Sequence, residues 1–489
     1  MGRRRFLAAG GTATALLGSF PARLLAAAPR TGRAARVAAD PAVTGSWTAP
    51  FNLGLVSIHA VLLHTGNVLL FSWPNDTVGS DAVLWNPVTG RITNIALTYQ
   101  RDIFCSGTTV LPDGRVFIAG GHIWQGALNP TQGVINTTIF DPASSAWTEG
   151  PLMSQARWYP ATTLLGNGTV IICGGTVNTG TNASTVDRYH PASNTINKLP
   201  STADKPMVTY PRVKLTSGGL LAWTNSATTY YLNPATATWT TGPKLASGNR
   251  TVTDMSVLLP GLTEILEAGG TTSSGVTSTA ELLSLSASQP AWAYTSAMHF
   301  ARQWANSVLL PDGTVLVVGG GAAGYYDRPV RTPEIYHPAT RTWTEMAAQT
   351  APRMYHSTAL LLPDGRVLSA GQSSGTYENT GEIFSPPYLF KGARPTITSA
   401  PATLGYRAAF TVTSPQAASI ARLVLIKPGA VTHSCNFDQR YVACTFTASG
   451  TRLSAVAPAS ANSAPPGWYL LFLVDVAGVP SVASWVHVG

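Results

Sequence analysis

The chain has 489 residues, too many for one ordinary domain unless the fold is a large repeat. Only 11% of the residues are charged, 46 are Gly and 35 are Pro, and no long 3.6-residue apolar period follows the N-terminal leader, which excludes a mainly helical protein. Seven arginines between positions 3 and 36 supply most of the +9 net charge, so the basic balance does not indicate a nucleic-acid partner.

Residues 1–39 are predicted to be an export signal and a linker. A basic start, a short apolar run and small residues at 26–28 are typical of exported proteins, and the run RRRFL at 3–7 resembles a twin-arginine signal. The alternative is a signal anchor, although the apolar run is shorter than the roughly 20 residues that a membrane span needs. We predict a secreted or cell-surface monomer that contacts the membrane only if the leader is retained.

A hairpin recurs along residues 45–390. Each copy is an apolar strand, a tight turn that usually contains Gly, and a second apolar strand that often ends in Gly-Gly; the turns are roughly 43 to 54 residues apart. The copies are 61–72, 109–121, 163–175, 213–224, 257–270, 308–321 and 360–372. A further strand and a Pro turn follow most copies. Four strands at this period are typical of a propeller blade, and the Gly-Gly with spaced aromatics resembles kelch repeats.

The predicted fold class is therefore all-β, with two domains after the leader. Residues 40–390 are interpreted as a seven-bladed kelch-type β-propeller. In residues 391–489 the pattern changes to short alternating strands, at the spacing and total length of an immunoglobulin-like sandwich.

Three of the four cysteines have an ordinary interpretation. Cys435 and Cys444 flank an eight-residue segment and are candidates for a disulfide across a hairpin in an oxidising compartment. Cys173 lies in an apolar strand, which is typical of a buried and inert thiol. Cys105 has no such explanation.

Aligning the hairpins on the Asp or Asn of the turn places reactive side chains at the same position in several hairpins. This position, at the start of the first strand, is called the strand entrance. Cys105, Tyr159, Trp304 and His356 each lie eight residues before that turn residue, and Tyr355 lies nine before it. Equivalent positions of propeller blades lie on a ring around the axis. The alignment therefore predicts that these side chains converge at one mouth of the channel.

A histidine outside the repeat is the candidate to complete this group. His433 lies at a predicted turn of the C-terminal domain, from which a loop can enter the propeller mouth, whereas the other histidines sit in repeated turns or lack a partner pattern. With Tyr159, Tyr355 and His356 it makes a mixed N,O set that suits Cu(II) and lacks the thiolates of a structural zinc site. Packing is the commoner role of tyrosine at a strand entrance, so position alone leaves both interpretations open.

Four motifs, in order along the chain, resemble those of the copper-radical oxidases, the galactose oxidase and glyoxal oxidase family. They are DIFCSG (102–107), RWYPATT (157–163), MYHSTALLLPDGRV (354–367) and VTHSCNFDQR (431–440). The resemblance covers roughly residues 45–489. It implies oxidation of a small aldehyde or a primary alcohol, including one on a carbohydrate, with O2 to give an acid or an aldehyde and hydrogen peroxide.

The resemblance also implies the roles of individual residues. Cys105 would form a thioether with the Tyr159 ring, and this protein-derived cofactor would carry a radical. Tyr159, His356 and His433 would be equatorial ligands of one copper ion and Tyr355 the axial ligand, with the substrate at an open position. Tyr355 would act as general base, and the radical would take a hydrogen atom from the substrate carbon.

Two departures from galactose oxidase favour the bacterial glyoxal oxidase-like branch. No carbohydrate-binding domain is expected before the propeller, and no Trp lies in residues 176–182, where galactose oxidase carries the indole that covers its cofactor. Trp124 and Trp304 are the candidates to cover the thioether, with plain packing as the alternative for each.

The competing interpretation is a secreted kelch propeller that binds a glycan or a protein without catalysis. It does not require Cys105, Tyr159, Tyr355, His356 and His433 to occur together, and their joint presence favours the oxidase. A second alternative is a copper protein that modifies cell-wall glycans.

Overall fold

The computed structural model of the protein describes residues 40–73, 80–97, 102–123, 132–324, 327–373 and 377–489. The predicted export signal and Trp124 lie outside these residues. Among the described residues no helix has the length and apolar character needed to cross a membrane. The α-helix of this part, α1 (Pro41–Thr44), is a single turn, and almost all other regular structure is β-strand. The predicted all-β class is confirmed.

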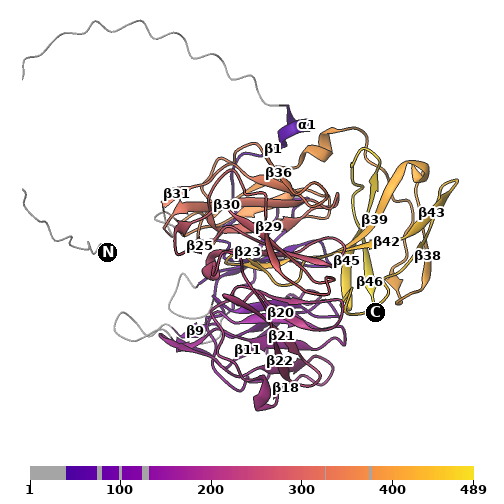
Figure 1. The fold of residues 1–489 in the computed structure, drawn as a ribbon. Coiled ribbons are helices and arrows are strands. Elements are labelled where there is room, and N and C mark those ends of the chain that lie inside the picture. Colours follow the sequence, from indigo (N-terminus) through magenta and orange to yellow (C-terminus); the bar gives the residue numbers. More distant parts are fainter. Residues whose placement is uncertain (1–39, 74–79, 98–101, 124–131, 325–326, 374–376) are drawn as a thin grey trace, which may run out of the picture. The chain divides into compact units, whose positions relative to one another are not determined.

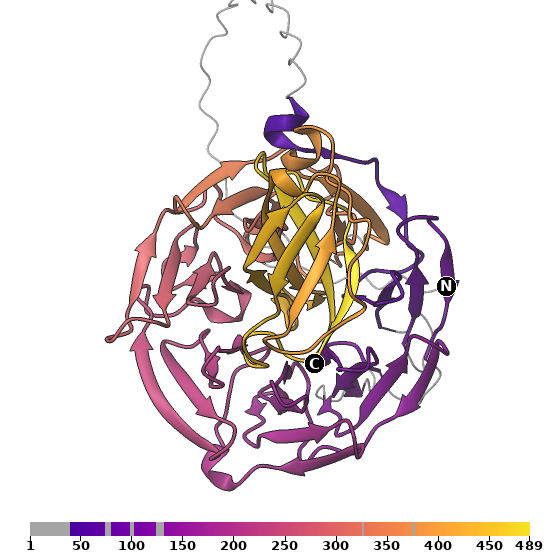
Figure 2. The ribbon, with the colours of Figure 1, turned by 90° about the vertical axis from the view of Figure 1, so that its right-hand side faces the viewer.

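Seven antiparallel sheets of the described residues form the blades of a propeller, arranged as a ring in Figure 2. The first strands, counted as blades one to seven, are β3 (His59–Leu62), β7 (Gly107–Val110), β13 (Ala161–Leu164), β19 (Val213–Leu215), β23 (Met255–Leu258), β29 (Gln303–Leu309) and β34 (Thr358–Leu361). The second strands are β4 (Val68–Phe71), β8 (Val116–Ala119), β14 (Val170–Cys173), β20 (Leu221–Trp223), β24 (Glu264–Ala268), β30 (Val315–Ala323) and β35 (Val367–Ala370). These pairs are the hairpins that recur in the sequence.

The third and fourth strands complete each blade outward (Figure 1). The third strands are β5 (Ala82–Trp85), β11 (Thr137–Asp141), β17 (Asp187–His190), β21 (Thr228–Asn233), β27 (Ala280–Ser284), β32 (Glu334–His337) and β36 (Thr380–Ser385). The fourth strands of blades one to six are β6 (Ile92–Asn94), β12 (Ala146–Glu149), β18 (Thr195–Lys198), β22 (Thr238–Lys244), β28 (Trp292–Thr295) and β33 (Thr342–Glu345). The first two strands are mostly buried and the fourth mostly exposed, because only the inner strands are packed between neighbouring blades.

The two ends of the propeller region meet in blade seven. Its outer strand is β1 (Ser46–Trp47), which pairs with β36 through Ser46 opposite Ser385 and Trp47 opposite Phe384. The Trp47 ring packs on Phe384 with the ring centroids 4.9 Å apart. The N-terminal strand thus closes the ring by supplying the outer strand of the last blade.

Buried arginines just before the first strands connect the start of a blade to the second and third strands of the same blade. Arg157, Arg250, Arg302 and Arg353 are each almost fully buried, donate to the carbonyl of the first Gly after an inner hairpin, and pair with a carboxylate on a third strand. The partners are Asp187, Glu281, Glu334 and Glu382, at 2.7 to 3.3 Å. A buried guanidinium is costly unless a carboxylate pairs with it, and each of these has one, although Nε of Arg157, Arg302 and Arg353 has no hydrogen-bond partner among the described residues. The repeat therefore holds the chain rigidly where the first strand begins.

The Gly-Gly that ends many hairpins is explained by close backbone contact. A Cβ at Gly319 (φ 73°) would lie 2.4 Å from the carbonyl oxygen of Arg353, and one at Gly371 (φ 71°) would lie 2.4 Å from that of Ser57. Only glycine allows the next blade's entrance to approach this closely.

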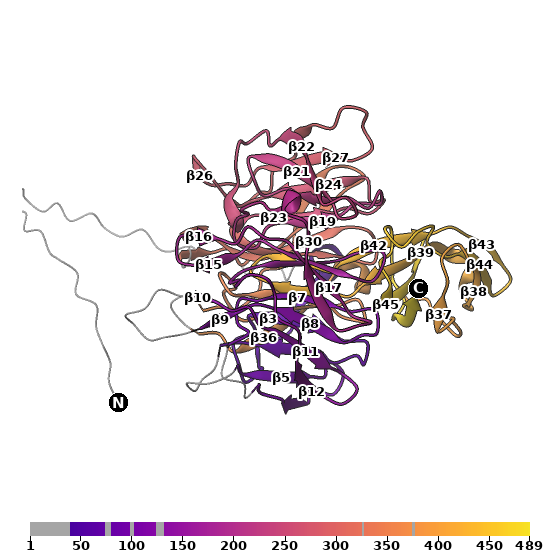
Figure 3. The same cartoon turned by 90° about the horizontal axis from the view of Figure 1, so that it is seen from below.

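The C-terminal domain is a sandwich of two sheets, visible in yellow and orange in Figure 3. One sheet has the order β37 (Thr403–Leu404), β46 (Ser484–Val488), β45 (Gly467–Asp475), β39 (Ile420–Lys427) and β42 (Arg440–Cys444). The other has the order β38 (Ala409–Thr413), β44 (Arg452–Val456) and β43 (Phe446–Ser449). The predicted immunoglobulin-like architecture of this part is confirmed.

One hairpin leaves this sandwich and joins the propeller. Strands β40 (Ala430–Thr432) and β41 (Cys435–Asn436) extend the sheet of blade one on its inner side, where β40 pairs with β3 and Thr432 lies opposite His59. The turn of this hairpin contains His433, so the C-terminal domain delivers that imidazole to the propeller axis.

The disulfide proposed for Cys435 and Cys444 is wrong, because both thiols are free. Cys435 lies on β41 in the propeller channel, where Arg212 Nη1 donates to its sulfur. Cys444 lies on β42 in the core of the sandwich. The short spacing in sequence misled the prediction, since the chain passes from one sheet to another between the two residues.

Candidate metal centre

The strand entrances that carry the predicted site residues share an unusual backbone. Cys105, Tyr159 and His356 each lie two residues before a first strand, with φ of 59°, 61° and 67°. Trp304, the second residue of β29, has a φ of 58°. Non-glycine residues rarely adopt this left-handed conformation, at a cost of about 1–3 kcal/mol each. The buried arginines and glycines around the entrances supply the packing that maintains it.

His433 reaches the same place from the C-terminal hairpin. His433 and Ser434 both have positive φ, 47° and 65°, so the turn between β40 and β41 is held in a strained form. Thr432 is paired with His59 of blade one, which fixes the residue directly before the turn.

The predicted ligand side chains converge on a single point. The phenol oxygens of Tyr159 and Tyr355 are 2.8 Å apart. The rings of His356 and His433 have centroids 4.5 Å apart, and the His433 ring lies 5.1 Å from that of Tyr159 and 5.3 Å from that of Tyr355. Four side chains from blades three and seven and from the C-terminal domain therefore surround one small volume.

Cys105 belongs to the same cluster. Its sulfur is 3.5 Å from Nε2 of His433, and it interacts with the side chain of Tyr159. Cys105 is fully buried, whereas Tyr159 and Tyr355 are partly exposed. The thiol is thus enclosed beneath the phenols, and the phenols lie on the side open to solvent.

Both imidazoles are oriented by a neighbouring hydroxyl on one ring nitrogen. Nδ1 of His356 lies 2.6 Å from Oγ of Ser373, and Nδ1 of His433 lies 2.6 Å from Oγ1 of Thr432. Nε2 of His356 is buried and has no hydrogen-bond partner among the described residues. A second-shell bond on one nitrogen with the other left open is typical of a metal-ligating histidine.

Burial sets the protonation of the cluster. It lowers the pKa of His356 to about 3 and that of His433 well below its usual value, so both imidazoles are neutral and available as ligands at neutral pH. Burial, together with the neighbouring Cys105 and Tyr355, raises the pKa of Tyr159 far above its usual value. An isolated phenol therefore stays protonated there, and a bound cation is needed to make it a phenolate.

The donor set fits a copper ion. Two neutral imidazole nitrogens and two phenol oxygens form the N,O combination that suits Cu(II). The partnerless, buried Nε2 of His356 is an orphaned polar atom that a metal would satisfy. A cluster of three possible ligand atoms on Cys105, His356 and His433, all within 4.8 Å of one another, has the same location.

The indole next to Tyr159 is not one of the two tryptophans proposed from the sequence. Trp158, its chain neighbour, is stacked on the Tyr159 ring with centroids 4.4 Å apart and planes at 29°. Trp304 contacts Tyr355 edge-on at 4.7 Å. Trp124 is outside the described residues. Trp158 was present in the motif RWYPATT. Because side chains alternate between the two faces of a strand, adjacent residues are not expected to stack on each other. Trp158 and Tyr159 do so because the backbone at Tyr159 is left-handed.

The alignment also passed over Tyr210, the fourth blade's equivalent of Tyr159. It has a φ of 44°, and its ring centroid lies 4.9 Å from both the Tyr159 and the His433 rings. Its hydroxyl donates to the carbonyl of Ser106 at 3.0 Å. The sequence does place Tyr210 eight residues before Gly218, the equivalent turn residue of this hairpin. Because that turn has no Asp or Asn, the alignment on Asp or Asn did not include it.

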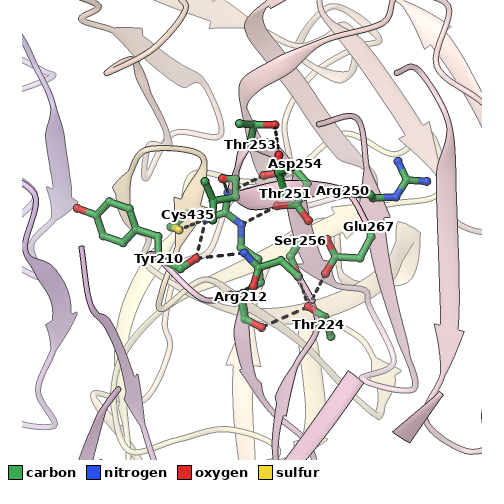
Figure 4. A network of polar contacts seen from close by, with 12 residues as sticks. Tyr210, Arg212, Thr224, Arg250, Thr251, Thr253, Asp254, Ser256, Glu267 and Cys435 are labelled. Carbon is green, nitrogen blue, oxygen red and sulfur yellow. Dashed lines mark hydrogen bonds and ion pairs between the residues drawn. The ribbon is translucent and has the colours of Figure 1, made fainter. Parts of the chain in front are cut away.

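A polar network links Tyr210, Arg212, Cys435 and Asp254 (Figure 4). Arg212 donates to the carbonyl of Tyr210 and to Cys435, and its Nε lies 3.2 Å from Oδ1 of Asp254. Because Cys435 follows His433 by two residues, this network contacts the hairpin that carries the histidine.

His59 is a further residue that the sequence left unassigned. It is fully buried, and its Nε2 accepts a hydrogen bond of 3.2 Å from the backbone N–H of Cys105. Its ring is stacked on Phe71. These contacts fix the backbone of Cys105, so His59 supports the cluster rather than joining it.

Both parts of the chain match known families. Residues 75–388 match the family described as glyoxal oxidase N-terminus, and residues 394–488 match the galactose oxidase-like, early set domain. A galactose oxidase of Gibberella zeae is 30% identical, covering 91% of this chain and 70% of the relative. The aldehyde oxidase GLOX of Vitis pseudoreticulata is 28% identical, covering 89% of this chain and 95% of the relative.

A solved structure has the same architecture. It is described as a novel fungal alcohol oxidase with catalytic diversity among the AA5 family, in complex with copper, and matches with a TM-score of 0.80 and 26% identity over 91% of this chain and 99% of that one. A seven-bladed propeller with a mixed imidazole–phenol centre completed by a C-terminal hairpin defines a class of mononuclear copper oxidoreductases. The chain belongs to the copper-radical oxidase family, with glyoxal oxidases and galactose oxidases as relatives.

Proposed function

We propose that the protein oxidises a small aldehyde or a primary alcohol, including one carried by a carbohydrate, with O2 to give an acid or an aldehyde and hydrogen peroxide. We place it in the bacterial glyoxal oxidase-like branch of its family and propose that it is exported. The observation that carries the reaction is the convergence of two imidazoles and two phenols around the partnerless Nε2 of His356.

Tyr159, Tyr355, His356 and His433 would hold the copper ion. When bound, copper supplies a Lewis acid for the substrate hydroxyl and a one-electron acceptor, which is half of the two-electron oxidation. The other electron must come to a group of the protein, and the buried thiol beside Tyr159 supports the assignment of that role to the Tyr159 ring.

Cys105 and Tyr159 would form the radical cofactor. A bond between Cys105 Sγ and a ring carbon of Tyr159 removes one hydrogen from each, with dioxygen taking the two electrons and two protons as hydrogen peroxide. Sulfur substitution lowers the oxidation potential of the phenol. The fully buried position of Cys105 supports this assignment, because it keeps the sulfur away from competing oxidants.

Tyr355 would accept the proton of the substrate hydroxyl, and the Tyr159 radical would take a hydrogen atom from the adjacent carbon. The 2.8 Å between the two phenol oxygens supports this division, since one substrate CH–OH group can reach both. An aldehyde reacts as its hydrate, which offers the same CH–OH group.

Trp158 would cover the radical. Its ring is stacked on Tyr159, and a large aromatic surface there limits solvent access and delocalises the unpaired electron. Trp304, in contact with Tyr355, would instead shape the side of the site where the general base lies.

A cavity of about 300 Å³ beside the centre is the proposed approach for the substrate. Trp73 and Tyr377 line it, and the Trp73 ring centroid lies 5.7 Å from that of His356. The size is at the lower end of ligand pockets, which supports a small substrate.

The test is to load the purified protein with copper in air and to analyse it by mass spectrometry. We expect a peptide joining Cys105 to Tyr159 that lacks two hydrogens, and peroxide production with one or more of glycolaldehyde, methylglyoxal and galactose. Absence of both copper binding and the cross-link would overturn the oxidase. A cross-link without peroxide on these three compounds would overturn only the proposed substrate range.

A further inference from the structure

A second polar cavity lies between the propeller and the C-terminal domain. Its volume is about 30 Å³, and its lining includes Lys214, Lys427, Asp438 and Arg440. Lys214 is on β19 of blade four, whereas Lys427 ends β39 and Arg440 begins β42 of the sandwich. The cavity is therefore assembled only when the two domains are docked.

Positive charge exceeds negative charge around this cavity. Lys427 has one carboxylate neighbour, Asp438, with Nζ 4.0 Å from Oδ1. That carboxylate already accepts hydrogen bonds from Oγ1 of Thr109 and the N–H of Val110. In the part of the chain that the structure describes, neither Lys214 nor Arg440 has a carboxylate within 4.0 Å. Three cations thus share a single acid.

Arg440 is the least compensated of these cations. It is only 6% exposed, it donates through Nη2 to the carbonyl of Leu215 at 2.6 Å, and its Nε is buried without a hydrogen-bond partner. Burial lowers its pKa to about 10, so it remains charged at neutral pH. An unpaired buried charge is strongly unfavourable unless a counter-charge is bound.

Other acidic groups near the cavity do not supply that counter-charge. Asp254 is paired with Arg212, and Glu267 is held by Thr224 with its pKa raised well above the usual value by burial. The Cys435 sulfur accepts a hydrogen bond from Arg212, and the Tyr469 hydroxyl donates to the carbonyl of Pro465 at 2.7 Å, so neither group is a carboxylate that could pair with the cations. The excess of positive charge therefore remains.

We propose that the cavity binds one small monatomic anion, chloride under physiological conditions, between Lys214, Lys427 and Arg440. A cavity of about 30 Å³ is far smaller than an ordinary ligand pocket, which favours a small anion over a large organic one. The anion would satisfy Nε of Arg440 and would link strands of both domains. It would also stabilise the hairpin that carries His433, because Lys214 donates to the carbonyl of Asn436 at 3.2 Å.

The direct test is diffraction from crystals of the copper-loaded protein grown in sodium bromide. We expect an anomalous peak for bromide in this cavity, within contact distance of Arg440 and Lys214. Crystals with no anomalous peak there would overturn the proposal, since bromide replaces chloride in sites of this kind. The readout is independent of catalysis, so it is unaffected if the proposed reaction is wrong.

The test in solution measures the melting temperature of the copper-loaded protein in rising chloride, with gluconate keeping the ionic strength constant. We expect a rise of about 1 to 2 °C for each tenfold increase above the dissociation constant. Arg440→Met and Lys214→Met remove the positive charges and should abolish the rise. Lys214 is only partly buried, so its variant serves if the arginine variant does not fold.

The matched control is Lys244→Met, which removes an exposed lysine from the outer strand of the same blade. It should keep the full response to chloride. An equal response in Lys214→Met and Lys244→Met would contradict the proposal.

Discussion

Blades three and five have the same arginine contacts before the first strand, but the side chains that follow these arginines differ. In blade three Arg157 joins the carbonyl of Gly174 to Asp187, and in blade five Arg250 joins that of Gly269 to Glu281. The residues that follow, Tyr159 and Thr251, both have left-handed backbones, with φ of 61° and 58°. The left-handed backbone at the strand entrance is thus a property of the repeat, and by itself it does not indicate a catalytic or metal-binding residue.

The difference lies in the side chain and in one short turn. Tyr159 follows its arginine by two residues and reaches the centre, whereas Thr251 follows directly and begins the 3₁₀ turn η2 (Thr251–Thr253), in which its hydroxyl bonds to Thr253. A common scaffold therefore presents several positions to the axis. Blades two, three and seven place the proposed cofactor and ligand residues there, and blade four places Tyr210 beside them.

The largest effect is expected from Tyr159→Phe, because it removes both a ligand oxygen and the proposed radical. Activity should fall to background, and the link to Cys105 should be absent in mass spectra. The matched variant Thr251→Val changes the equivalent entrance of blade five and should retain full activity and copper content. Comparable loss in the two variants would show that the entrances act through the fold alone.

Cys105→Ser is expected to come next. It removes the thioether but no proposed copper ligand, so the protein should bind copper with little change and lose most of its activity. Metal analysis together with peroxide assays separates these two effects. A fully active variant would refute the role proposed for Cys105.

Ser373→Ala tests how much the hydrogen bond between Ser373 and His356 contributes to copper affinity. The hydroxyl holds Nδ1 of His356 at 2.6 Å, and loss of such a second-shell bond weakens metal binding by about 10- to 100-fold. Competition with a copper chelator measures the change. Ser369→Ala, which removes a buried hydroxyl elsewhere in blade seven, should leave the affinity unaltered.

The smallest effect is expected for Trp158→Leu. Loss of an aromatic contact amounts to about 0.5–1.5 kcal/mol, which corresponds to roughly 2- to 10-fold in the stability of the radical. The lifetime of the tyrosyl radical signal, followed by electron paramagnetic resonance, checks this. Trp304→Leu should affect the radical less, because its ring contacts Tyr355.

Much of the fold and of the candidate centre could be predicted because both leave local signals. The hairpin repeat identifies every first and second strand of the propeller, since alternating apolar residues and a Gly turn are sufficient to define a hairpin. Counting back from the turn placed Cys105, Tyr159, Tyr355 and His356 at the same end of their blades.

The residues that were missed depend on the path of the backbone. Trp158 shares a face with Tyr159 only through the left-handed turn between them, and Tyr210 was hidden by an atypical turn. The disulfide between Cys435 and Cys444 was wrong for a related reason, because β41 leaves the sandwich for the propeller.

The sequence by itself therefore determined the repeat, its period, the residue types at each entrance and the membership of the family. Only the tertiary structure decided that His433 meets His356 with ring centroids 4.5 Å apart and that Arg440 is buried without a carboxylate partner. The physical reason is the sequence separation of the contacting residues. Turns and strand patterns are set by neighbours in the chain. A shared centre and an uncompensated charge arise from contacts between segments that are far apart in sequence.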